Sequence, residues 1–215
     1  MDIKAFIFDM DGLLFDSERI VQRSWEIAGD ELGIPHMGNV IYHTLGMNRA
    51  GRNEYFRKYI REDFPFEEFG RLTRDNFWKI VDKEGLPLKK GAKELLAYGK
   101  SQGYKMAVAT SSSREYAMGN LIRAGIDSHF DSVVCGDMVK KAKPDPEIYQ
   151  KACESLGIQP EYCMAFEDAP GGILSAHQAG MQVIMVPDLV QPTQEIRELT
   201  YRVCDSLADV IGILN

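Results

Sequence analysis

Short apolar runs alternate with helix-like stretches along most of the chain. Each run is bounded by charged residues or glycine, which is typical of strands buried on both faces of a parallel sheet. The stretches between them carry apolar residues at helical spacing, and several end at a glycine. The expected strands are residues 3–8, 105–109, 132–135, 162–166 and 182–186. The expected helices are residues 90–102, 113–124 and 171–179, with another that opens at Asp145-Pro146 and stops at Gly157.

One long segment departs from this alternation. Residues 17–84 contain helical patterns and no convincing strand, and Gly85-Leu86-Pro87-Leu88 then has the composition of a linker. In the first expected helix, the apolar residues follow the spacing i, i+4, i+7 and i+11; they are Val21, Trp25, Ala28 and Leu32. Gly33 then ends this helix. We therefore expect a helical domain of residues 17–85 inserted into an α/β domain of residues 1–16 and 86–215. Repeated strand–helix units predict a doubly wound, Rossmann-like parallel sheet with helices on both faces.

Charge and cysteine content limit the possible partners. The 215 residues carry a formal net charge of -7, which argues against binding to nucleic acid or to an anionic membrane. The four cysteines form no CxxC, so reduced thiols and a cytoplasmic location are expected. No apolar stretch is long enough to span a membrane. Because the residues before Asp9 are those of the expected first strand, we expect no signal peptide. We expect a monomer whose partner is a small molecule.

Polar segments follow four of the apolar runs, directly or closely. They are Asp9-Met10-Asp11-Gly12, Thr110-Ser111, Lys143-Pro144 and Glu167-Asp168. Because ligands of an open α/β sheet bind at the carboxyl ends of its strands, these segments should meet at one edge. Together they supply a nucleophilic carboxylate, a second carboxylate, a hydroxyl, an ammonium and an acidic pair for a cation. This inventory favours phosphoryl transfer.

The first segment by itself has a simpler interpretation. Asp9 and Asp11 could belong to a charged turn in which Gly12 supplies a permissive backbone angle. Two carboxylates so close repel each other unless a proton or a cation intervenes, and Mg²⁺ prefers oxygen ligands. The flanking sequence Phe-Asp-Met-Asp-Gly-Leu-Leu-Phe-Asp-Ser makes the simple turn the weaker interpretation.

The other segments also have ordinary alternatives. Residues 110–113 end a strand and open a helix, where hydroxyls either cap the helix or help its N–H groups to hold an anion. Lys140 and Lys141 suit a solvated surface, whereas Lys143 stands before Pro144 and a new helix. The acidic pair 167–168 can simply complement a helix dipole or can hold a cation. The occurrence of all four in order favours one shared site.

With these four segments the chain resembles the haloacid dehalogenase superfamily of phosphohydrolases. DMDGLLFDS, ATSSS, KPDP and FEDAPGGI are similar to its four motifs, and the resemblance covers the full length. The helical insert resembles the small α-helical cap of the β-phosphoglucomutase-like branch. The resemblance implies that Asp9 is the nucleophile, which forms an aspartyl-phosphate, and that Asp11 is the general acid–base. Thr110 and Lys143 would hold the phosphoryl group.

The resemblance also implies a magnesium site and a substrate loop. Mg²⁺ would be bound by Asp9, by the backbone carbonyl of Asp11 and by Asp168. Glu167 would be either a further ligand or a residue that orients the ligands without contacting the ion. Ser111 would join the substrate-binding hydroxyls. Residues 44–49 resemble the substrate loop of the cap, in which Arg49 could meet a distal phosphate of the substrate. A solvated arginine between cap helices is the alternative for Arg49.

Two departures distinguish this chain from the mutases of that branch. The stretch 18–23 has no histidine where the mutase carries one that assists its sugar chemistry, and Leu45 stands where a mutase lysine is expected. We therefore expect an Mg²⁺-dependent phosphatase that acts on a small phosphorylated metabolite, and a sugar phosphate is the favoured kind of substrate. The main alternative is a β-phosphoglucomutase-type phosphosugar mutase. A dehalogenase is disfavoured because Asp11, Glu167 and Asp168 suit a metal-dependent site, and a protein that only binds a phosphometabolite is disfavoured because every catalytic residue type is present.

Overall fold

The computed structural model describes residues 2–44 and 49–214, with only the backbone of residues 49 and 50. The chain divides into two compact units. The α/β unit consists of Met1–Asp16 and Pro87–Asn215, and the helical unit consists of Ser17–Leu86. Among the described residues, no helix combines the length and the apolar character needed to cross a membrane.

The α/β unit is built on a parallel sheet with strand order β3-β2-β1-β4-β5-β6. The strands are β1 (Ala5–Phe8), β2 (Lys105–Thr110), β3 (Ser132–Cys135), β4 (Cys163–Glu167), β5 (Gln182–Met185) and β6 (Arg202–Val203). β1 lies between β2 and β4, with Phe8 opposite Val108 on one side and Phe166 on the other. Every residue of β1 is buried, which explains its uninterrupted apolar sequence.

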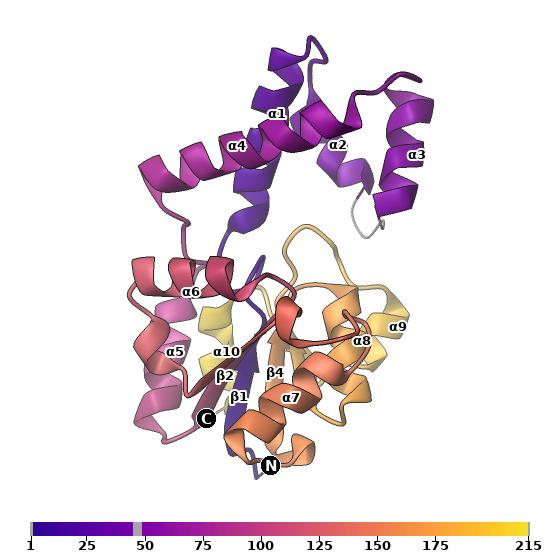
Figure 1. The fold of residues 1–215 in the computed structure, drawn as a ribbon. Coiled ribbons are helices and arrows are strands. Elements are labelled where there is room, and N and C mark those ends of the chain that lie inside the picture. The colour runs from indigo at the N-terminus through magenta and orange to yellow at the C-terminus, as the bar shows by residue number, and fades with distance from the viewer. Residues whose placement is uncertain (1, 45–48, 215) are drawn as a thin grey trace. The chain divides into compact units, whose positions relative to one another are not determined.

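Helices cover both faces of this sheet (Figure 1). They are α5 (Ala92–Ser101), α6 (Arg114–Arg123), α7 (Glu147–Leu156), α8 (Pro170–Gln178), α9 (Gln194–Glu198) and α10 (Leu207–Leu214). Ile148 of α7 and Ile173 of α8 pack in one apolar cluster with Ile7. On the other face, Gly99 of α5 lies so close to Phe6 that an added Cβ would be 3.2 Å from its ring. The expected doubly wound α/β fold is thereby confirmed.

Three details of the α/β unit differ from the expectation. The short strand β6 and the helices α9 and α10 were not expected. β6 has two residues and α9 has five, which are too few to show a period, whereas Leu207, Val210, Ile211 and Leu214 of α10 do have helical spacing. The helix expected to open at Asp145-Pro146 has Pro146 as its N-cap, so Asp145 lies one position before the cap. Asp145 Oδ1 nevertheless accepts a hydrogen bond of 3.1 Å from the backbone N–H of Glu147. Gly157 ends α7 in the left-handed region, as expected.

The helical unit has an aromatic core of its own. Its helices are α1 (Ser17–Glu31), α2 (Met37–Thr44), α3 (Arg49–Tyr59) and α4 (Phe66–Glu84). Trp25 of α1 meets Phe56 of α3 and Phe69 of α4 edge to face, with ring centroids 5.6 Å apart in both pairs. Arg23 and Glu84 link α1 to α4 with a hydrogen bond of 2.7 Å. The helical character expected for this segment is therefore present in its described residues.

Candidate active site

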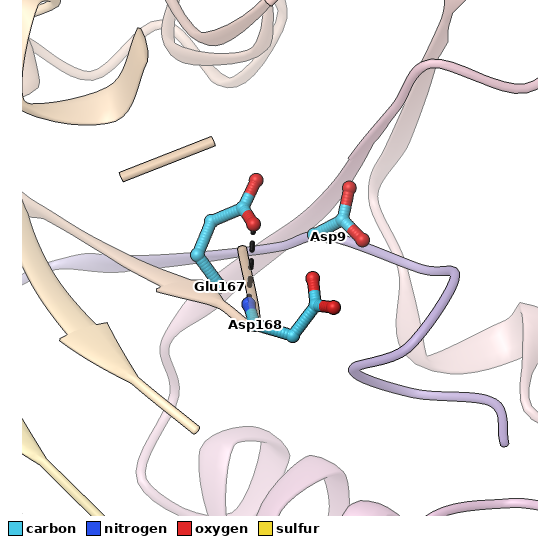
Figure 2. Close-up of side chains that lie close together, drawn as sticks. All are labelled: Asp9, Glu167 and Asp168. Atoms are coloured by element: carbon cyan, nitrogen blue, oxygen red, sulfur yellow. Dashed lines mark hydrogen bonds between the residues drawn. The ribbon is translucent and has the colours of Figure 1, made fainter. Parts of the chain in front are cut away.

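The ends of the neighbouring strands β1 and β4 bring three carboxylates together. The backbone N–H of Asp9 donates to Phe166 O at 3.0 Å, which places Asp9 beside the end of β4. Asp9, Glu167 and Asp168 each offer a carboxylate oxygen, and these oxygens all lie within 4.8 Å of one another. Figure 2 shows the three carboxyl groups gathered at this point. They are the only group of this kind found among the described residues.

Lys143 inserts its ammonium into this cluster from the loop before α7. Its Nζ donates to Asp9 Oδ1 at 2.5 Å, to Glu167 Oε1 at 2.7 Å and to Ala109 O at 2.9 Å. Burial by itself lowers the pKa of Lys143, but the charges of Asp9 and Glu167 outweigh this and raise the pKa above its ordinary value. The ammonium therefore stays charged between the two carboxylates.

Two carboxyl groups of the cluster, those of Asp9 and Asp168, have raised pKa values. Burial raises the pKa of Asp9 to about 7 against the lowering effect of Lys143, and the charges of Glu167 and Asp11 add to the rise. Burial also raises the pKa of Asp168 well above its usual range, as do the charges of Asp9 and Glu167. One ammonium does not neutralise three carboxylates, so the cluster favours an additional proton or cation.

Asp11 lies outside this cluster and has different partners. Ser112 Oγ donates to Asp11 Oδ2 at 2.7 Å, and Tyr116 Oη donates to Asp11 Oδ1 at 3.1 Å. Gly12 follows with a φ of +85°, and an added Cβ at this position would overlap the Asp168 carboxylate. Gly12 is therefore required both by its backbone angle and by the close approach of the first segment to Asp168.

The hydroxyl segment begins at the end of β2, next to β1. Thr110 is buried, and its Oγ1 accepts a hydrogen bond of 3.1 Å from the backbone N–H of Ser112. Ser111 is exposed in the turn that follows. The four segments predicted to meet therefore lie beyond neighbouring strands of one sheet edge. The backbone of Arg49 begins α3, whereas its side chain and residues 45–48 lie outside the described part of the chain.

Sequence reasoning missed three residues that support the site. Ser112 stands within the hydroxyl segment but was given no separate role, and Tyr116 lies in the first turn of the next helix. Tyr149 of α7 is fully buried, and its Oη donates to Glu167 Oε1 at 2.6 Å. Its ring also faces Lys143, with Nζ 4.9 Å from the ring centroid. Both tyrosines occur within helices, where an aromatic residue usually indicates packing, so only the fold could reveal these contacts.

This arrangement can support displacement at a phosphorus or carbon centre. Asp9 is a buried carboxylate that accepts a hydrogen bond from the ammonium of Lys143, and the carboxylate of Asp168 lies next to it. Asp11 is near enough for its charge to raise the pKa of Asp9, yet separate hydroxyls hold it. Two carboxylates in such different surroundings are suited to different tasks, one as nucleophile and one as proton carrier.

Comparison with known proteins agrees with this chemistry. The sequence model of a family described as "Haloacid dehalogenase-like hydrolase" matches residues 6–186. A "Phosphorylated carbohydrates phosphatase" of Thermotoga maritima is 32% identical over 182 residues, which are 85% of this chain and 84% of the relative. "Hexitol phosphatase A" of Escherichia coli is 32% identical over 193 residues, which are 86% of this chain and 84% of the relative.

Solved structures resemble the chain over nearly its whole length. The crystal structure of CbbY from Rhodobacter sphaeroides in complex with phosphate has a TM-score of 0.74 and 27% sequence identity. The match covers 97% of this chain and 96% of CbbY. A β-phosphoglucomutase from Clostridium difficile is also among the structural matches. These similarities extend through both units of the chain.

Proposed function

Because the chain belongs to the haloacid dehalogenase-like hydrolase family, we propose that it hydrolyses a small phosphorylated metabolite through an aspartyl-phosphate at Asp9. The family expected from the four motifs is confirmed, and with it the enzyme class, a phosphoric monoester hydrolase. The proposed aspartyl-phosphate at Asp9 is supported by the ammonium of Lys143, which forms salt bridges with both Asp9 and Glu167 beside Asp168.

A sugar or sugar-alcohol phosphate is the proposed kind of substrate. Its support comes from two relatives, one named for phosphorylated carbohydrates and the other for hexitol phosphates. CbbY, which has the same fold, was crystallised with phosphate. A monoester of this kind presents one dianionic phosphoryl group, whose charge Lys143 and a bound cation would compensate together.

The acidic cluster fits a magnesium ion. Its donors are all oxygens, which hard cations prefer. Burial, and after it the charges of neighbouring carboxylates, raises the pKa of Asp9 and of Asp168, and a cation would offset both effects. Asp9 and Asp168 would hold the ion, with the backbone carbonyl of Asp11. Glu167 Oε1 accepts hydrogen bonds from Lys143 and Tyr149, and Oε2 accepts one from the Asp168 N–H, so Glu167 is better placed to orient Asp168 than to bind the ion. When bound, Mg²⁺ supplies positive charge to the transferring group.

The proposed reaction has two steps at phosphorus. An oxygen of Asp9 forms a bond to phosphorus while the bond from phosphorus to the ester oxygen breaks, and Asp11 gives that leaving oxygen a proton. Asp11 then takes a proton from water, whose oxygen attacks phosphorus and releases phosphate from Asp9. Lys143 compensates the negative charge on the phosphoryl group throughout, with Thr110 and Ser111 as further contacts.

The helical unit is proposed to act as a cap that selects the substrate, with Arg49 as a candidate contact for a distal anion. Closure of such a unit would exclude bulk water during the reaction. The four cysteines are free and buried, which supports the expected cytoplasmic location. The monomeric state stays a prediction.

A panel of phosphorylated metabolites tests this proposal. Hexose, hexitol and pentose phosphates are incubated with the protein and Mg²⁺, and release of inorganic phosphate is measured. We expect turnover of at least one of them and loss of turnover when the metal is chelated. β-Glucose 1-phosphate with a bisphosphate primer is included, because glucose 6-phosphate as its product would identify a mutase instead. No turnover across the panel would favour a protein that only binds phosphometabolites.

A further inference from the structure

Two hydroxyl groups from a distant part of the chain hold both oxygens of Asp11. Ser112 Oγ donates to Oδ2 at 2.7 Å and Tyr116 Oη donates to Oδ1 at 3.1 Å. Asp11 follows β1, whereas Ser112 follows β2 and Tyr116 lies in the first turn of α6. An aspartate side chain bonded at one oxygen can still rotate about its last bond, but two donors on two oxygens fix the plane of the carboxyl group.

The segment that carries these hydroxyls is itself firmly held. The backbone N–H of Tyr116 donates to Ser113 Oγ at 3.4 Å, which caps α6. The N–H of Arg114 donates to Asp137 Oδ2 at 3.0 Å, and the N–H of Gly136 donates to Ser112 O at 2.8 Å. Because the backbone is tied at three points and a tyrosine has only two main rotatable bonds, the position of Oη is determined by the fold.

We propose that Tyr116 is a positioning residue for Asp11, which orients its carboxyl group for delivery of a proton to the leaving oxygen. This role rests on the proposed function, in which Asp11 is the general acid. Tyr116 does not exchange the proton itself. Without the Tyr116 hydroxyl, only Ser112 would hold Asp11, at Oδ2. The carboxyl group would then sample orientations that cannot reach the leaving oxygen.

The dependence on the leaving group separates this role from a structural one. A sugar alkoxide is a poor leaving group and needs a proton as the ester bond breaks, whereas 2,4-dinitrophenolate leaves without one. The ratio kcat/KM reports the steps up to the first irreversible one, here cleavage of the ester bond, so the later hydrolysis of the aspartyl-phosphate does not enter. Loss of the Tyr116 hydroxyl should therefore affect only the sugar phosphate.

The experiment compares Tyr116→Phe with the wild type on glucose 6-phosphate and on 2,4-dinitrophenyl phosphate, both with Mg²⁺. General acid catalysis typically contributes 10²–10⁴-fold, and misorientation removes part of it, so we expect kcat/KM for the sugar phosphate to fall about tenfold. The value for the dinitrophenyl ester should change by less than about twofold. Asp11→Asn gives the full size of the effect. Tyr201→Phe, an exposed tyrosine of the same unit, is the matched control and should leave both esters unaffected.

The remaining outcomes contradict the proposal. Equal losses on both esters would assign Tyr116 a purely structural role. An unchanged or faster reaction with glucose 6-phosphate would mean that the hydroxyl merely restrains Asp11 in a resting position. If the wild type hydrolyses neither these esters nor any phosphate of the panel, the proposed function fails and the role of Tyr116 fails with it. A wild type active on both esters, with no selective loss in the variant, overturns only the role of Tyr116.

Discussion

At the scale of single residues, the site depends on a buried ammonium between two buried carboxylates. Lys143 and Asp9 each expose only 10% of their side chain, and Glu167 exposes 2%. Removal of one partner from such a group leaves an uncompensated charge, so charge-preserving and charge-removing substitutions will differ strongly in their effect on folding. Functional tests of these three residues should therefore use substitutions that keep size and hydrogen bonding.

Asp9→Asn should abolish turnover while the protein stays folded. The amide oxygen can still accept the hydrogen bond from Lys143, but an amide is a poor nucleophile and a poor metal ligand. Loss of an essential nucleophile typically costs several orders of magnitude in kcat. Phosphate release measures activity and circular dichroism checks the fold. Activity above about a hundredth of the wild-type value would contradict the nucleophile assignment.

Asp168→Ala should increase the Mg²⁺ concentration needed for half-maximal activity at least about tenfold, because one carboxylate of the acidic pair is lost. The measurement is a titration of activity with Mg²⁺. Asp205→Ala removes an exposed carboxylate of the same unit and should leave the half-saturation point unchanged. If both variants titrate like the wild type, Asp168 only complements the dipole of α8.

At the scale of elements, the site requires the start of α8 to approach the end of β4 very closely. Gly172 lies against the Glu167 side chain, and a Cβ at this position would overlap the carboxyl group. Glu167 cannot move aside freely, because Lys143 and Tyr149 hold Oε1 and the Asp168 N–H holds Oε2. The glycine therefore permits a contact between helix and strand that any larger residue would displace.

Gly172→Ala should destabilise the protein by roughly 1–3 kcal/mol and reduce activity, because the added methyl group forces Glu167 out of its hydrogen bonds. Gly171→Ala is the matched control in the same helix, since a Cβ there meets no atom within 4 Å. It should be neutral or stabilising by up to about 1 kcal/mol. Urea unfolding and phosphate release measure the two effects. Equal stability of the two variants would show that Glu167 adapts without cost.

At the scale of the whole molecule, the buried carboxylates of the site lower the free energy of unfolding when they are charged. The α/β unit has an apolar core on both faces of its sheet, and that core keeps the carboxylates of the site away from water. Burial is the largest cause of the raised pKa values of Asp9 and Asp168. The same packing that prepares the site therefore makes its charged state unfavourable without a cation.

The metal-free protein should lose stability as pH rises from 5 to 8. The folded pKa of Asp9 is about 7 against 3.8 when unfolded, so within this range the folded state binds more protons than the unfolded state. Asp168 acts in the same direction. Carboxylates with a lowered pKa, such as Glu147 at about 2, make their opposite contribution below this range.

Urea unfolding in the presence of a chelator measures this effect. We expect the free energy of unfolding to fall by roughly 1–3 kcal/mol between pH 5 and pH 8, and Asp9→Asn should show a smaller fall. Mg²⁺ should stabilise the wild type more at pH 8 than at pH 5, because protons no longer compete with it. A free energy that stays constant or rises with pH would contradict the raised pKa values.

Local patterns in the sequence were sufficient to predict the main strands and the segments that follow them. The apolar runs before Asp9, Thr110 and Glu167 are buried strands because burial on both faces requires an unbroken apolar sequence. Helix ends such as the one at Gly157 could also be predicted, because the left-handed backbone conformation that ends a helix favours glycine. β6 escaped prediction because a strand of two residues has no period to detect.

The sequence by itself determined that carboxylates, hydroxyls and an ammonium stand beyond buried parallel strands, because strand burial and helix stops depend on residues close together in the chain. The tertiary structure alone decided the strand order, which places β1 between β2 and β4 and therefore Asp9 between Thr110 and Glu167. It also decided that Tyr116 would reach Asp11, that Tyr149 would reach Glu167 and that burial would raise the pKa of Asp9. These features depend on packing between segments far apart in sequence, and no local pattern records which side chains that packing will bring into contact.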